Sequence, residues 1–155
     1  MNILEFKVNN LEETREFGIK MGKLLEAGDI VCLNGQLGMG KTTMTKSIGL
    51  GLDVDEYITS PTFTLINEYK GRVKLYHFDV YRLENLEEVY DLGFDEYFFG
   101  NGVCIIEWAE KIDKIVPKER IVIDIEAGKD ENERVFYISG FGQRYEEVLK
   151  ELKGN

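Results

Sequence analysis

The chain has 155 residues, of which 43% are hydrophobic and 31% are charged, and its 29 acidic and 19 basic residues give a formal net charge of −10. This length and composition predict one compact domain that spans residues 1–155. The acidic charge disfavours direct binding to nucleic acid, because a surface of this sign repels a polyanion, so we expect the partner to be a protein.

The first 33 residues predict a strand, a helix and a second strand. Apolar residues at every other position indicate a strand over residues 4–8 with one face in water. Asn10 and Glu13 fit a capping box, and the helix that they open carries apolar side chains at helical spacing. Gly28 is expected to end this helix. Residues 30–33 form a fully apolar run, which predicts one buried strand.

The next segment, GQLGMGKTT at residues 35–43, matches the phosphate-binding pattern G-x-x-x-x-G-K-[ST]. Its glycines let the backbone wrap so that successive N–H groups point inward, and a helix predicted to begin at Lys41 adds the positive end of its dipole. Lys41 would reach the β- and γ-phosphates of a nucleoside triphosphate, and the Thr42 hydroxyl would hold a Mg²⁺ ion that bridges them. The alternative is a glycine-rich turn that caps a helix. It is disfavoured because a buried strand precedes the pattern and a helix follows it.

The middle of the chain predicts a hairpin and then a short helix. Strand-like runs at residues 62–69 and 73–80 flank a turn at residues 70–72, and this hairpin implies antiparallel members in the sheet. Asn85 and Glu88 form a second capping pattern, which opens the short helix. Three side chains of this helix are expected to face inward: Leu86, Val89 and Tyr90.

The rest of the chain predicts three more strands and a closing helix. The strands cover residues 103–106, 121–126 and 134–139, and a polar turn separates the last two. The helix carries Tyr145, Val148, Leu149 and Leu152 on one face. Together these elements predict a three-layer α/β domain with a mixed sheet.

Two acidic residues follow predicted strands and could complete a phosphate site. Glu107 follows the apolar run 103–106 directly, as a Walker B acid does, and Asp79 lies at the end of the run KLYHF. Either carboxylate could hold Mg²⁺, directly or through water, or orient the attacking water. The alternative for Glu107 is an acid that ends a strand and faces solvent, and the alternative for Asp79 is an acid that only marks the end of a strand.

Three other residues lie near these acids in the sequence. Thr62, in the segment SPTF at residues 60–63, could sense the γ-phosphate and Mg²⁺, although the start of a strand explains it nearly as well. Trp108 alone would more often be a large core or interface side chain than a catalytic one. His77 alternates with its neighbours in a predicted strand, and we interpret it as structural.

The sequence also favours a cytoplasmic protein. No apolar run approaches the length of a membrane span, and the first ten residues lack a signal-peptide pattern. Cys32 and Cys104 each lie inside an apolar run, so we interpret them as small core residues rather than as a disulfide. We therefore expect a reducing compartment and no membrane partner.

Four motifs in order resemble the TsaE (YjeE) family, the small ATPase of bacterial tRNA threonylcarbamoyladenosine synthesis. They are GQLGMGKTT at 35–43, SPTFTLINEY at 60–69, YHFDVYRL at 76–83 and IIEWAEKI at 105–112. The resemblance implies a three-layer P-loop NTPase domain with a mixed, mostly parallel central sheet and an antiparallel hairpin. It also implies an ATPase that hydrolyses ATP slowly and needs Mg²⁺. This ATPase would act on the complex of the proteins TsaD and TsaB during modification of the adenosine at tRNA position 37.

The resemblance also assigns roles to individual residues. Lys41, Asp79 and Glu107 would be catalytic, and Thr42 and Glu107 would hold Mg²⁺. The residues expected to bind ATP are Thr14, Gly35, Leu37, Gly38, Met39, Gly40, Lys41, Thr42, Thr43, Thr62 and Trp108.

Three other functions remain as alternatives. A small-molecule kinase could use the same loop, but no arginine-dense lid segment and no second substrate pocket are evident from the sequence. A GTP switch is disfavoured because the sequence has neither N-K-x-D nor D-x-x-G. In an assembly module with a structural nucleotide, Lys41→Ala would abolish folding and hydrolysis together.

Overall fold

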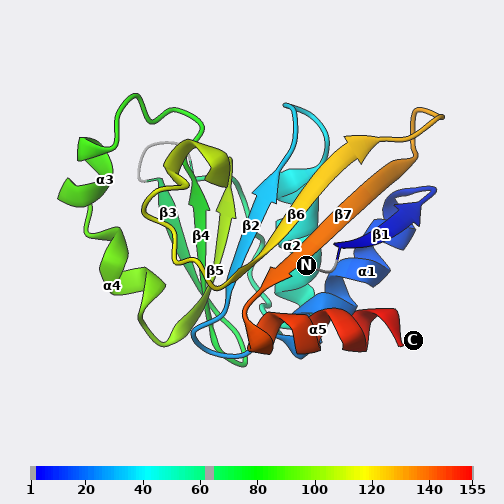
Figure 1. The fold of residues 1–155 in the computed structure, drawn as a ribbon, viewed down its shortest axis with the longest axis horizontal. Helices are drawn as coiled ribbons and strands as arrows, with labels where there is room; N and C mark the ends of the chain where they lie inside the picture. The colour runs from blue at the N-terminus through cyan, green and yellow to red at the C-terminus, as the bar shows by residue number, and fades with distance from the viewer. Residues whose placement is uncertain (1–2, 62–64, 155) are drawn as a thin grey trace.

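The computed structural model describes residues 3–61 and 65–154, which form a seven-stranded sheet with helices on both faces (Figure 1). The strands are β1 (Ile3–Val8), β2 (Ile30–Asn34), β3 (Ile66–Lys70), β4 (Lys74–Asp79), β5 (Gly102–Glu107), β6 (Arg120–Ala127) and β7 (Arg134–Phe141). Across the sheet they lie in the order β1-β7-β6-β2-β5-β4-β3. The predicted three-layer α/β architecture is confirmed.

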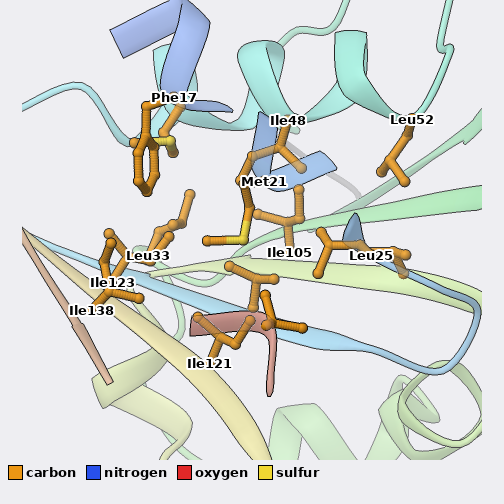
Figure 2. Close-up of a cluster of buried hydrophobic side chains, with 14 of the residues drawn as sticks. Phe17, Met21, Leu25, Leu33, Ile48, Leu52, Ile105, Ile121, Ile123 and Ile138 are labelled. Atoms are coloured by element: carbon orange, nitrogen blue, oxygen red, sulfur yellow. The ribbon is translucent and has the colours of Figure 1, made fainter. Parts of the chain in front are cut away.

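The helices divide between the two faces of the sheet. One face is covered by α1 (Leu11–Leu24), α2 (Lys41–Gly51) and α5 (Gln143–Lys153), and the other by α3 (Glu87–Asp91), α4 (Phe94–Phe98) and the 3₁₀ helix η1 (Ala109–Ile112). Side chains of β2 alternate between two hydrophobic cores, with Leu33 in the first core and Cys32 in the second. Figure 2 shows part of the first core, where Met21 of α1 and Ile48 of α2 pack over the sheet. Within the described ranges, no helix combines the length and the apolar character that crossing a bilayer needs.

The pairing of the strands confirms a mixed sheet that is parallel at its centre. β2 pairs in parallel with β5 and β6, and β5 pairs in parallel with β4. β3 and β4 form the predicted antiparallel hairpin, and β1, β7 and β6 pair antiparallel at the other side. The parallel strands β2, β4 and β5 therefore end at the same edge, where Leu33 and Asp79 are both aligned with Glu107.

The hairpin begins later than predicted. β3 starts at Ile66, whereas the sequence pattern predicted a strand from residue 62. Leu65 has a φ angle of 65°, in the left-handed region that is incompatible with an extended strand, so the pairing begins after it. Residues 62–64, including the predicted switch residue Thr62, lie outside the described residues.

Helix α1 begins as predicted but ends before Gly28. The side chain of Asn10 accepts a hydrogen bond from the N–H of Glu13 at 2.9 Å, which is the predicted cap. The helix ends at Leu24, and the guanidinium group of Arg72 donates hydrogen bonds to carbonyl groups of its last turn and cap. These carbonyls therefore need no glycine cap, and Gly28 lies in the turn that follows.

The prediction that Tyr90 faces inward is wrong. The side chain of Asn85 accepts a hydrogen bond from the N–H of Glu88 at 3.2 Å, as the capping pattern predicted. Val89 is buried and Leu86 is partly buried, but Tyr90 is 65% exposed. The helix has only five residues, so it presents a single narrow face to the core, and Val89 occupies that face.

The buried thiols predict a loss of stability at alkaline pH. Burial raises the pKa of Cys32 and the pKa of Cys104 from 9.0 to about 12. Between these pH values the unfolded chain binds fewer protons than the folded chain, so the free energy of unfolding falls as the pH rises. Urea unfolding at pH 8 and pH 10.5 would measure the fall. A double variant, Cys32→Ala with Cys104→Ala, should show a smaller fall than the parent chain, and an equal fall in both would contradict the assignment.

Candidate functional site

The glycine-rich loop between β2 and α2 has the geometry of an anion-binding turn. Gly38 and Gly40 have φ angles of 83° and 106°, a left-handed conformation that strains any residue with a Cβ atom. Gly40 is the N-cap of α2, which begins at Lys41 as predicted and has no side-chain cap. The first N–H groups of α2 have no carbonyl partner within the helix, so they are available to an anion in the loop.

The side chain of Lys41 is folded back into this loop. Its Nζ donates hydrogen bonds to the carbonyl oxygens of Gly35 at 2.6 Å and Gln36 at 3.0 Å, and it lies 3.9 Å from the centroid of the Trp108 ring. The residue is only 5% exposed. Burial lowers the pKa of Lys41, while nearby carboxylates, first that of Glu107, oppose this change. Carbonyl and aromatic groups thus hold an ammonium group that a phosphate could bind more strongly.

Trp108 is held in an unusual backbone conformation beside the loop. Its φ angle is 64°, which is rare for a bulky side chain, and its N–H donates to the carbonyl of Leu33 at 3.0 Å. Its ring also packs on that of Tyr81, with 4.6 Å between the centroids. Backbone strain of this kind concentrates at functional sites, so the conformation supports the predicted role of Trp108 at the site.

Glu107 lies under the start of α2 and is only 2% exposed. Its carboxylate accepts hydrogen bonds from the hydroxyl groups of Thr42 at 3.0 Å and Thr45 at 3.2 Å, and it also contacts Nε2 of His77. The Thr42 hydroxyl is 3.0 Å from that of Ser60 as well. The interpretation of Glu107 as a solvent-facing strand end is therefore wrong.

Asp79 is aligned with Glu107 in the sheet and is partly buried. Its carboxylate accepts a hydrogen bond from the N–H of Tyr81 at 3.1 Å. Burial raises the pKa of Asp79, and the Tyr81 N–H partly offsets this effect. A raised pKa makes a carboxylate a stronger proton acceptor, as a group that activates water requires.

Two cavities flank the loop. The first, of about 230 Å³, is lined by Leu11, Thr14, Gly38, Met39, Gly40, Thr43, Asn132, Arg134 and Phe136. The second, of about 340 Å³, is lined by Leu37, Ser60, Pro61, Leu65, Asp79, Tyr81, Arg82 and Trp108. The loop could therefore hold the phosphates of a nucleotide, with the first cavity at one end of the phosphate chain and the second cavity at the other.

The structure brings the residues expected at the site together, except for Thr62, which lies outside the described residues. Lys41, Thr42, Asp79, Glu107 and Trp108 gather where β2, β4 and β5 end. Five of the expected residues line the first cavity beside the loop, and Leu37 lines the second. The five are Thr14, Gly38, Met39, Gly40 and Thr43.

Sequence reasoning missed three contacts of the site, those made by His77, Thr45 and Ser60. His77 precedes Asp79 by two residues in a strand, so both side chains point to the same face of the sheet. Thr45 follows Thr42 by three residues in a helix and shares its face. These two spacings were available in the sequence. Ser60 begins the segment SPTF, in which the prediction named the hydroxyl of Thr62 instead.

A sequence model of the family described as "Threonylcarbamoyl adenosine biosynthesis protein TsaE" matches residues 8–136 of the chain. The chain belongs to the TsaE family. This match includes every residue that the sequence predicted at the site, and the resemblance seen in the four motifs is confirmed. TsaE membership assigns the chain to the biosynthesis of threonylcarbamoyladenosine in tRNA.

Individual TsaE proteins and a solved structure agree with this assignment. The tRNA threonylcarbamoyladenosine biosynthesis protein TsaE of Bacillus subtilis is 46% identical over 154 residues, which are 98% of this chain and 95% of that protein. The protein of the same name from Treponema pallidum is 44% identical over 80% of this chain and 92% of its own length. The crystal structure of Bacillus subtilis YdiB superposes with a TM-score of 0.83 at 40% identity, covering 99% of this chain and 95% of that one.

Proposed function

We propose that this TsaE-family chain binds ATP with Mg²⁺ and hydrolyses it slowly, and that the hydrolysis supports tRNA modification through the proteins TsaD and TsaB. One observation carries the proposal. The Lys41 amine, the Thr42 hydroxyl and the Glu107 carboxylate gather around a glycine-rich loop that opens a helix. A triphosphate with its metal ion needs these three kinds of group together.

Mg²⁺ fits the oxygen donors of Thr42 and Glu107. The Thr42 hydroxyl oxygen lies 3.0 Å from Oε1 of Glu107, and Mg²⁺ prefers carboxylate, hydroxyl and phosphate oxygens. Residues 3–61 and 65–154 contain no group of three or more His, Cys, Asp or Glu side chains that could hold a metal, so phosphates and water would supply the other ligands. When bound, the ion would neutralise charge on the phosphates.

The remaining residues have distinct roles in the proposed hydrolysis. Lys41 leaves the loop carbonyls and binds the β- and γ-phosphates, where its charge stabilises the transition state. Asp79 accepts a hydrogen bond from the attacking water and orients it, and its raised pKa suits this task. The adenine base would occupy the cavity beside Thr14 and Met39.

Tryptophan fluorescence provides a direct test of ATP binding. Trp108 is the only tryptophan of the chain, and the Lys41 ammonium lies 3.9 Å from the centre of its ring. Binding of ATP draws the ammonium toward the phosphates, so the emission of Trp108 should change and saturate. Lys41→Ala should weaken ATP binding by about tenfold to a hundredfold, because a hydrogen bond to a charged group contributes about 1.5–3 kcal/mol.

Two controls make this test decisive. GTP should produce a weaker response than ATP if the chain prefers adenine. Calorimetry of the parent chain with ATP and Mg²⁺ reports binding independently of fluorescence, and the absence of any heat of binding would overturn the proposal.

Recovery of TsaD and TsaB from a bacterial lysate on the immobilised chain, with and without ATP, tests the partner assignment.

One observation keeps the small-molecule kinase as a second candidate. The cavity of about 340 Å³ is lined by Asp79 and Arg82, although no second substrate pocket was evident from the sequence. A kinase substrate there would receive the γ-phosphate. Incubation with labelled ATP and candidate acceptors distinguishes the two functions, because a saturable acceptor supports the kinase and release of inorganic phosphate supports the ATPase.

A further inference from the structure

His77 is buried within the site although no ATP atom is expected to reach it. It lies on β4, is 0% exposed, and its Nε2 is in hydrogen-bond contact with Oε2 of Glu107. A carboxylate can only accept, so Nε2 carries the hydrogen and donates it. His77 is the only histidine of the sequence.

The contacts of Glu107 divide between its two oxygens. Oε2 is held by His77 from the sheet. The Thr45 hydroxyl of α2 lies 3.2 Å from Oε2 and shares its hydrogen with the carbonyl oxygen of Lys41 at 3.0 Å. Oε1 accepts its hydrogen bond from the Thr42 hydroxyl at 3.0 Å, a shorter contact than the 3.3 Å between Thr42 and Oε2. The bonds to Oε2 therefore fix the rotation of the carboxylate and direct Oε1 toward Thr42.

We propose that His77 is a positioning residue, which holds Oε2 of Glu107 so that Oε1 and the Thr42 hydroxyl face the same Mg²⁺ ion. This inference rests on the proposed function, because it assigns a role to the Mg²⁺ of that site. Groups that hold metal ligands in place from outside the coordination shell commonly contribute tenfold to a hundredfold to metal affinity.

A purely structural role explains the histidine less well. Its Nδ1 atom is buried and has no hydrogen-bond partner among the described residues. A buried nitrogen without a partner lowers stability. The neighbouring side chains on the same face, Leu75 on β4 and Ile105 on β5, are buried and apolar, so packing alone would favour an apolar residue at this position. The bond from Nε2 to Glu107 accounts for the imidazole.

Variants with the same amide at two lengths test the proposal. The amide nitrogen of His77→Gln reaches about as far as Nε2 and can donate to Glu107, whereas the amide of His77→Asn is one methylene shorter and falls short. Calorimetry would measure ATP affinity with Mg²⁺ and with EDTA for the full-length chain and both variants, and circular dichroism would follow folding. His77→Leu, which fills the space without a donor, provides a third variant.

The expected result separates metal positioning from packing. The gain in ATP affinity on adding Mg²⁺ should fall by about tenfold in His77→Asn and His77→Leu, and His77→Gln should retain most of it. Affinity in EDTA should be equal in all folded chains. An equal Mg²⁺ effect in the parent, Asn and Gln chains overturns the positioning role alone, and so does an equal loss in Asn and Gln. A parent chain that binds ATP without any Mg²⁺ effect, or does not bind it, overturns the proposed function as well.

Discussion

Replacing Glu107 with glutamine should lower the rate of ATP hydrolysis by about a hundredfold or more, which is the usual effect of removing one group that stabilises charge in a transition state. The substitution keeps the size of the side chain and removes its negative charge. Glu107 accepts hydrogen bonds from Thr42 and Thr45, and the amide oxygen of glutamine can retain part of this bonding. The domain should therefore stay folded while it loses the carboxylate that is proposed to hold Mg²⁺.

The measurement is phosphate release in the presence of TsaD and TsaB, with thermal unfolding as a check on the fold. Glu126→Gln is a matched control, because Glu126 is an exposed acid near the end of β6, which β2 separates from β5. This variant should hydrolyse ATP at the parent rate. Asp79→Asn should also slow hydrolysis, since it removes the proposed water-orienting carboxylate. If Glu107→Gln and Asp79→Asn both keep the parent rate, the assigned roles are wrong.

The parts of the site that could be predicted depend on neighbours in the sequence. The glycine-rich loop and the helix from Lys41 follow from a pattern of nine residues, GQLGMGKTT. Asp79 and Glu107 each end an apolar run, and the ends of parallel strands meet at one edge of a sheet, so their presence at the same edge follows from a local pattern and a general rule.

The parts that could not be predicted depend on groups far apart in the chain. Helix α1 ends early because Arg72 donates to its last turn across about 50 positions, and no local pattern reports that contact. The bond between His77 and Glu107 depends on the register of β4 on β5, which the periodicity of each strand leaves undetermined. The stacking of Lys41 on Trp108 needs the left-handed backbone of Trp108, which the sequence does not signal.

The orientation of the loop depends on a close contact between α1 and α2. Gly22 of α1 faces α2 without a side chain, and a Cβ atom there would lie 2.3 Å from the carbonyl oxygen of Ile48 and 2.8 Å from the Cα atom of Gly51. Both are backbone atoms, so no side-chain rotation could relieve the clash. Because α2 begins in the glycine-rich loop and α1 carries Thr14, the packing of the two helices brings together two walls of the first cavity.

Gly22→Ala should therefore destabilise the fold by about 3 kcal/mol, at the upper end of the usual cost of overpacking a core. A loss of stability would distinguish this close contact from an ordinary helix position, where alanine stabilises by roughly 1 kcal/mol relative to glycine. Urea unfolding would measure the loss, and the Trp108 titration should show weaker ATP binding since α1 moves away from the loop. Lys23→Ala, at the exposed neighbouring position of the same helix, should change stability by less than about 0.5 kcal/mol. A Gly22→Ala chain as stable as the parent would show that α1 and α2 can separate freely, and the loop would then owe its shape to its own glycines.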